Sequence, residues 1–199
     1  MWTHLQIVAI CMAVATTTGV ALGLVVARWQ GLATVILAVT STILTVPSFA
    51  LFGLLSIWVG LGNPPVEVGL TLYALLPITR NTRAGILAVE PSVVEAARGM
   101  GMSRRQVLTR VELPLAVPVV LAGIRQATVM IVAIATVGAA VGANDLGQPI
   151  FTAIGRSTGT LDRVLAGIVP VAAIGILADL VLAGVQRLLS RGRVAVAAT

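Results

Sequence analysis

The stretch from Glu95 to Pro114, EAARGMGMSRRQVLTRVELP, is the only long polar run in a chain that otherwise consists of apolar segments. It holds four of the thirteen arginines, which are Arg98, Arg104, Arg105 and Arg110. The flanking segments are long and apolar enough to be membrane helices. This polar run is therefore expected to lie outside the bilayer, on one side of it.

The run has a defined spacing of small, acidic and helix-ending residues. Glu-Ala-Ala is followed after three residues by glycine, and after nine more by an aliphatic residue, one further residue and Leu-Pro. These positions are Glu95, Ala96, Ala97, Gly101, Val111, Leu113 and Pro114. The pattern predicts a helix, a turn and a second short helix. An ordinary basic loop between two spans would not need this spacing.

Local sequence signals support this helix, turn and helix. Ser92 is expected to cap the first helix, with Glu95 three residues later completing a capping box. Gly101 permits the backbone conformation that a sharp turn needs. Ser103 is expected to cap a helix over Arg104–Glu112, which Pro114 limits. Because Ala96 and Ala97 are small, another protein surface can approach both closely.

The 95–114 run resembles the EAA loop of the membrane subunits of bacterial ABC importers, with Val111 where that family usually has isoleucine. Further stretches are similar to the permeases of its osmoprotectant branch, which imports glycine betaine, choline, carnitine and related quaternary amines. These are TVPSFALFGLL (45–55), LYALLPITRNTRAGI (72–86), the region 95–129 and DLGQPIF (145–151). The resemblance covers about residues 20 to 185.

The resemblance implies a type I ABC importer fold and a set of partner proteins. In that family the EAA loop is a cytoplasmic coupling helix that docks into a cleft on the ATPase subunit. The seven motif residues are then the ATPase-coupling residues, within a loop over 90–114. The implied partners are an ABC ATPase subunit, an extracytoplasmic substrate-binding protein, and a second copy or paralogue of this permease.

The composition independently indicates an integral membrane protein. The 199 residues are 58% hydrophobic and 10% charged, whereas a soluble domain is about 25% charged. The mean hydropathy is +1.05. We therefore expect a single all-α transmembrane domain over residues 1–199, embedded in the lipid bilayer.

The charged residues exclude several classes of function. The net charge is +6 and the chain has no lysine, so it has no P-loop lysine to bind nucleotide phosphates. We therefore expect no cofactor in this chain, no enzyme activity of its own, and ATP on a partner subunit. The arginines flank apolar spans, as in membrane proteins, which argues against nucleic-acid binding. His4 is the only histidine, so no histidine-based metal site is expected.

About five transmembrane helices are predicted from the apolar segments and turn signals. Their approximate ranges are 5–27, 32–56, 65–83, 115–141 and 164–186. The second is expected to be kinked near Pro47, and a shallow re-entrant segment around 51–62 is an alternative. Trp29 marks a headgroup-level interface, and Gly138 with Gly142 forms a small-xxx-small pair typical of helix packing. A short helix is expected over Pro149–Ile154.

Two charges lie inside predicted spans at a similar depth. Arg125 is in the fourth and Asp179 in the fifth. An intramembrane charge is a functional hypothesis by default. We interpret the two as a possible ion pair near an inner gate, with snorkelling or a purely structural pair as the alternatives.

The arginine distribution predicts the orientation of a multi-pass protein of the bacterial cytoplasmic membrane. With the 95–114 run inside, eleven arginines lie at the inner face or its borders, and Arg156 and Arg163 lie outside. This bias follows the positive-inside rule. Five spans then place the N-terminus outside and the C-terminus in the cytoplasm.

The sequence therefore favours the permease subunit of an ATP-driven, binding-protein-dependent importer of osmoprotectants. An importer of another small solute, such as methionine, is the alternative within the class. A passive channel or a scaffold is the alternative from another class, although neither explains the spacing of the 95–114 run. With few aromatic residues in the chain, we expect solute selectivity to lie in the binding protein.

Overall fold

The structure is a computed structural model that describes the backbone of residues 1–155 and 161–194 and the side chains up to residue 189. Every regular element in these residues is helical. The elements are α1 (Trp2–Arg28), α2 (Gln30–Thr45), α3 (Ser48–Val59), α4 (Asn63–Leu87), α5 (Pro91–Gly99), α6 (Arg104–Val107), a π-helix η1 (Leu108–Glu112), α7 (Leu113–Ala135), a 3-10 helix η2 (Thr136–Val141), α8 (Gln148–Ile154) and α9 (Leu161–Val194).

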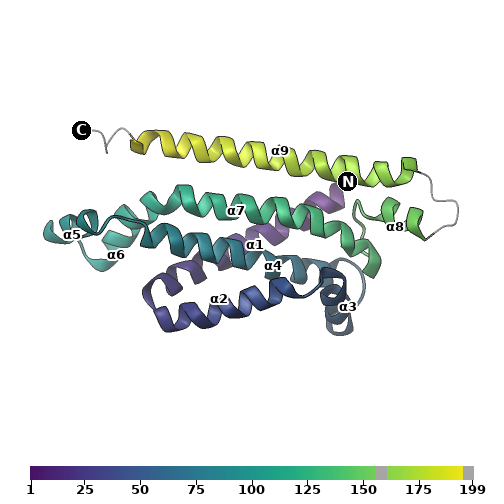
Figure 1. Cartoon of the computed structure of the whole chain (residues 1–199), viewed down its shortest axis with the longest axis horizontal. Helices are drawn as coiled ribbons and strands as arrows, with labels where there is room; N and C mark the ends of the chain where they lie inside the picture. The colour runs from purple at the N-terminus through teal and green to yellow at the C-terminus, as the bar shows by residue number, and fades with distance from the viewer. Residues whose placement is uncertain (156–160, 195–199) are drawn as a thin grey trace.

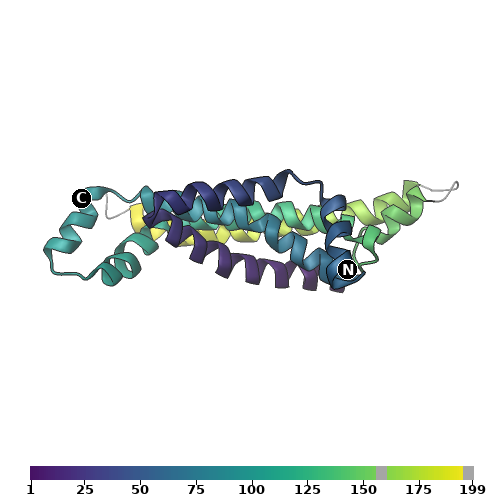
Figure 2. The same cartoon turned by 90° about the horizontal axis from the view of Figure 1, so that it is seen from below.

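The longer helices α1, α2, α4, α7 and α9 run along the long axis of the molecule (Figure 1). The short helices α5 and α6 lie together at one end of this bundle, and α3 and α8 lie at the other. Figure 2 shows α5 and α6 projecting beyond the ends of the long helices. Helix α4 is central because it packs against α1, α2, α3 and α7, whereas α9 packs on α7 and α8.

Three helical stretches among the described residues are long and apolar enough to cross a membrane. They are Trp2–Arg28, Arg104–Val141 and Leu161–Leu189. A fourth is possible if α2 and α3 together form one span. Helix α4 falls short of the same criteria, although its 25 residues are enough for a bilayer core of about 30 Å. The predicted total of about five spans stays a prediction.

The predicted second span over 32–56 is wrong as a single, merely kinked helix. Helices α2 and α3 are separate and meet at an angle of 102°. Pro47 lies between them, and the amide of Val46 closes the last turn of α2 on the carbonyl of Ile43. Because proline has no N–H to continue that ladder, α2 ends there. The re-entrant alternative for 51–62 fits this sharp turn better than a continuous span does.

Helices α1 and α4 approach closely because α1 presents glycines at the contact. A Cβ on Gly19 would lie 2.8 Å from Ile78 Cγ2, and one on Gly23 would lie 2.4 Å from Thr82 Cβ. Lipid supplies no hydrophobic drive between helices, so close packing of this kind carries much of their association. The Thr79 hydroxyl also donates to the Gly19 carbonyl at 3.3 Å.

The expected packing pair Gly138 and Gly142 divides into two different roles. Gly138 is packed, because a Cβ there would lie 2.8 Å from Val66 Cγ2. Gly142 instead ends η2 with a φ of +85°, which is a turn conformation that favours glycine. The two glycines are therefore not one helix face. Most of the 142–162 connection is described, and it contains α8 over Gln148–Ile154 as predicted, but Arg156 lies outside the described residues.

The loop after Gly142 is fastened to the start of α4. The amide of Asn144 donates to Asn63 Oδ1 at 3.1 Å, and the amide of Gly62 donates to the Val141 carbonyl at 2.9 Å. Asp145 is buried in this loop, where Oδ1 accepts from the Gly147 amide at 2.7 Å. Its Oδ2 has no hydrogen-bond partner within the described part of the chain. Burial raises the pKa of the Asp145 carboxyl to about 7.

The α1–α4 contact predicts that Gly23→Ala destabilises the protein. Overpacking a close contact costs about 1–3 kcal/mol, because the new methyl group has no room beside Thr82. The readout is the thermal unfolding midpoint of the purified protein in detergent. Gly31→Ala is the matched control, since a Cβ at Gly31 would meet no atom within 4 Å. Equal midpoints for Gly23→Ala and the parent protein would contradict the packing argument.

Asp145 predicts a pH-dependent stability. Its pKa is raised in the folded protein, so the folded state holds a proton that the unfolded state releases near pH 4. The free energy of unfolding should therefore fall as the pH rises from about 4 to about 7, by up to about 1.4 kcal/mol per pH unit. Asp145→Asn should remove this slope in denaturation experiments at pH 5 and pH 8. A control substitution, Asp162→Asn at an exposed position, should leave it in place.

Candidate functional site

The candidate site is the segment 90–114, which links α4 to α7 at the projecting end of the bundle (Figure 1). The predicted helix, turn and helix are present as α5, a turn over 100–103, and α6 followed by η1. The predicted capping box of Ser92 and Glu95 is wrong. With Pro91 in the first turn, the N-cap of α5 is Glu90, and the Ser92 hydroxyl instead donates to Glu90 Oε1 at 2.7 Å.

The turn after α5 is a Schellman motif that requires Gly101. The amide of Met102 donates to the Ala97 carbonyl at 3.2 Å, and the amide of Gly101 donates to the Arg98 carbonyl at 2.9 Å. This pair of bonds closes a helix around a residue in the left-handed conformation. Gly101 has a φ of +82°. A Cβ at Gly101 would meet nothing within 4 Å, so glycine is needed here for its backbone angle alone.

The second helix begins with a complete capping box at Ser103, which confirms the predicted cap. The Gln106 amide donates to Ser103 Oγ at 3.4 Å, and the Ser103 amide donates to Gln106 Oε1 at 2.8 Å. The reciprocal bonds satisfy two amides that a bare helix start would leave unpaired. The turn is therefore held on both sides by hydrogen bonds among its own residues.

The expectation that Pro114 ends the second helix is wrong. The helical run continues from Arg104 to Val141, with Pro114 in the first turn of α7. The preceding residues Leu108–Glu112 form a π-helix. A proline ring clashes with the carbonyl four residues earlier in an α-helix, and the wider π turn relieves this crowding. The segment 90–114 therefore joins the long helix α7 in one continuous helical run.

The seven motif residues differ in their exposure. Glu95, Ala96 and Gly101 are exposed, Val111, Leu113 and Pro114 are half-buried, and Ala97 is only 2% exposed. Both alanines were expected to face a partner, but only Ala96 is open to one. Ala97 lies inside the segment, where its carbonyl accepts the bond of the Schellman motif. The Glu95 carboxylate is left without an ion pair to any described side chain.

An ion pair that sequence reasoning missed ties the segment to α1. Arg28, at the end of α1, donates through Nη2 to Oε2 of Glu112. Glu112 is buried, beside the motif residue Val111. The two residues are 84 positions apart, so no local pattern connects them. The sequence did hold one signal. Glu112 is an acid at the start of an apolar span, and a charge at such a place needs a cationic partner.

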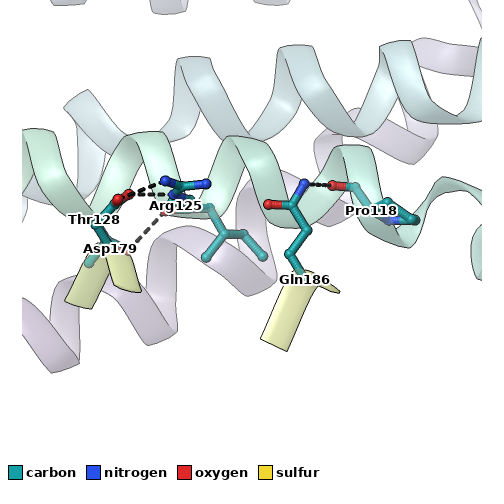
Figure 3. Close-up of polar contacts among 6 residues, drawn as sticks. Pro118, Arg125, Thr128, Asp179 and Gln186 are labelled. Atoms are coloured by element: carbon teal, nitrogen blue, oxygen red, sulfur yellow. Dashed lines mark hydrogen bonds and ion pairs between the residues drawn. The ribbon is translucent and has the colours of Figure 1, made fainter. Parts of the chain in front are cut away.

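Arg125 and Asp179 are brought together, joining α7 to α9 (Figure 3). The guanidinium donates Nε to Oδ1 and Nη2 to Oδ2, the latter at 2.7 Å. Each side chain is about one-third exposed, at 37% and 33%. They line an open cavity of about 460 Å³ with Gln126 and Met130. Further along the same helix pair, Gln186 Nε2 donates to the Pro118 carbonyl at 2.9 Å.

The described part of the chain contains no group of three or more His, Cys, Asp or Glu side chains placed to hold a metal ion. The features that the described residues do present are the projecting segment 90–114 and two ion pairs between helical segments.

A family profile matches residues 19–193, and its description is "Binding-protein-dependent transport system inner membrane component". The chain belongs to this family. It is thus an inner-membrane transport component, and its permease role is distinct from that of an ATPase chain.

Named relatives match almost the whole of this permease. It is 42% identical over 176 residues to the glycine betaine/carnitine/choline transport system permease protein OpuCD of Bacillus subtilis, which covers 88% of this chain and 76% of that protein. It is 37% identical over 192 residues to the osmoprotectant import permease protein OsmW of Salmonella typhimurium, covering 94% and 88%.

A solved structure has the same fold. An inward-facing structure of the MetNI methionine ABC transporter superposes with a TM-score of 0.82 and 22% identity, covering 94% of this chain and 93% of that one. At this identity the match concerns the fold alone. The permease has the all-helical fold of type I ABC importer permeases.

The Arg125–Asp179 pair predicts non-additive effects of substitution. Arg125→Gln or Asp179→Asn alone leaves one unpaired charge within the bundle, whereas the double substitution leaves none. We expect each single change to lower the thermal midpoint and the transport rate, and the double change to be milder than the sum. Strict additivity would contradict the coupling. Asp162→Asn with Arg163→Gln, two exposed residues of α9, is the control pair.

Proposed function

We propose that this permease forms the membrane pathway of an ATP-driven importer of quaternary-amine osmoprotectants such as glycine betaine, choline or carnitine. The names of its relatives support this solute class. The observation that supports the transport mechanism is the segment 90–114, whose turn is held by its own hydrogen bonds. This segment projects from the bundle and leads directly into α7. ATP is bound and hydrolysed on a separate ATPase chain.

In this proposal the exposed side of the segment docks on the ATPase. Ala96 allows close approach, Glu95 offers a free carboxylate for orientation, and Gly101 fixes the angle between α5 and α6. Val111, Leu113 and Pro114 join the docked part to the span. A surface of this kind couples only if its contacts with the ATPase differ between the open and closed states of the transporter.

Movement of the docked segment reaches the spans through both of its ends. One end continues from α4, which packs on four other helices, and the other continues into α7. A displacement of α5 and α6 therefore acts at once on the central helix and on its neighbour. The Arg125–Asp179 pair, which joins α7 to α9, carries that displacement to the last span and acts at an inner gate.

The aromatic side chains are dispersed and do not favour a solute cage within this chain. Quaternary amines are typically held by several aromatic faces together. Tyr73 is buried, with its hydroxyl donating to the Val46 carbonyl at 2.7 Å, and Phe52 is buried in the core. We therefore assign solute selection to an extracytoplasmic binding protein. A second copy or paralogue of the permease completes the pathway, with the N-terminus outside and the C-terminus in the cytoplasm.

Substitutions at Gly101 test the docking role. A residue with a Cβ in the left-handed conformation costs about 1–2 kcal/mol, with asparagine tolerated best. We expect Gly101→Val to reduce permease-stimulated ATPase activity by about tenfold, and Gly101→Asn to reduce it less. Gly99→Ala is the matched control, since Gly99 lies in α5 and a Cβ there would meet nothing within 4 Å. Full stimulation by Gly101→Val would refute the role.

The solute is tested by uptake of labelled glycine betaine at high osmolarity. The strains are one lacking the gene, the same strain carrying the gene, and one carrying Gly101→Val. Unlabelled choline, carnitine and methionine are the competitors. Uptake restored by the intact gene and competed by quaternary amines is the expected result. Competition by methionine alone would replace quaternary amines with methionine as the proposed solute, and it would leave the importer proposal unchanged.

A further inference from the structure

A basic cavity lies between the end of α1 and the 90–114 segment, and we call it the arginine pocket. It has a volume of about 700 Å³ and is lined by Arg28, Trp29, Arg98, Met102, Arg104 and Arg105, with two aliphatic residues from the start of the second helix. None of these residues is one of the seven motif positions. The coupling proposal therefore leaves this concentration of charge unexplained.

Three of its four arginines have no anionic partner among the described residues. Arg28 is paired with Glu112, but Arg98, Arg104 and Arg105 are exposed and form no ion pair with any described acid. Like charges held around one cavity repel each other. Arg104 and Arg105 also open the helical run Arg104–Val141, where the helix dipole disfavours cations. A bound anion would offset both costs.

The walls of the arginine pocket favour an amphiphilic anion. Guanidinium groups bind phosphate with two parallel hydrogen bonds. Trp29, which is 60% exposed, and Met102 add apolar surface to the same cavity. Tryptophan is enriched at the headgroup level of membranes. A free inorganic anion would gain no binding from these apolar contacts, whereas a phospholipid has both a phosphate and acyl chains.

We propose that the arginine pocket binds the phosphate of an anionic phospholipid at the membrane face that carries the 90–114 segment. Basic pockets of this kind at the cytoplasmic ends of spans bind anionic headgroups. Because Arg28 and Trp29 belong to the end of α1 while Arg98 and Met102 flank the Gly101 turn, the bound lipid bridges α1 to the coupling segment. The inference uses the membrane placement of the chain and is independent of the transported solute.

The test is lipid binding by the full-length permease, purified without ATPase or solute. Native mass spectrometry would compare phosphatidylglycerol with phosphatidylcholine of the same acyl chains. We expect phosphatidylglycerol to bind preferentially, and Arg104→Gln with Arg105→Gln to reduce this binding by about tenfold or more. Arg80→Gln with Arg110→Gln is the matched control, since it removes the same charge from exposed arginines outside the pocket.

A second readout places the lipid at the pocket even if a variant is poorly stable. Of the three tryptophans, Trp2 and Trp58 are replaced by phenylalanine, which leaves Trp29 as the only indole. Headgroup-labelled anionic lipid should quench Trp29 more strongly than labelled zwitterionic lipid. Equal quenching, or unchanged phosphatidylglycerol binding by the pocket variant, would overturn the proposal. Displacement of the lipid by millimolar inorganic phosphate would overturn it in favour of a soluble anion.

Discussion

The close approach of α4 to α1 and α7 is the constraint on which the bundle depends. Glycines on α1 meet Ile78 and Thr82, and a Cβ at Gly123 of α7 would lie 2.7 Å from the Pro77 carbonyl. In a bilayer, van der Waals packing has to replace the hydrophobic drive that assembles soluble cores. The remaining elements are arranged around this contact: α2 and α3 pack on α4, and α9 is attached through α7.

Two ion pairs then hold together the helical segments that are packed less closely. Helix α9 meets the bundle mainly through α7, and the Arg125–Asp179 pair lies in that interface. The Arg28–Glu112 pair joins the end of α1 to the last residue of η1, directly before α7. One pair therefore joins two long helices, and the other joins α1 to the segment 90–114. The site is therefore positioned by packing at the centre of the bundle and by ion pairs at its margins.

Much of the fold and part of the site follow from local sequence. The membrane class, the helix–turn–helix of the segment, the need for Gly101 and the Ser103 cap are all encoded within a few residues. The contact of Arg125 with Asp179 was predictable from their similar depth. The break at Pro47 was predictable too, but the size of the 102° turn was not, because a proline interrupts the backbone ladder without fixing the angle between the two helices. The Arg28–Glu112 pair was not predictable either. Pro114 was wrongly expected to end the second helix, because a π-helical turn accommodates its ring.

The Schellman motif and the capping box have a mechanical consequence. Together they pair the amides of Gly101, Met102, Ser103 and Gln106 with acceptors inside the segment, so the shape of the turn is held by its own residues. A lever transmits force only if it is stiffer than its joints. On either side of the turn, the chain leaves regular α-helix at the link 88–90 and in the π-helix Leu108–Glu112. In the coupling role that we propose, a displacement imposed on the segment would bend the chain at these two places before it distorted the turn between them.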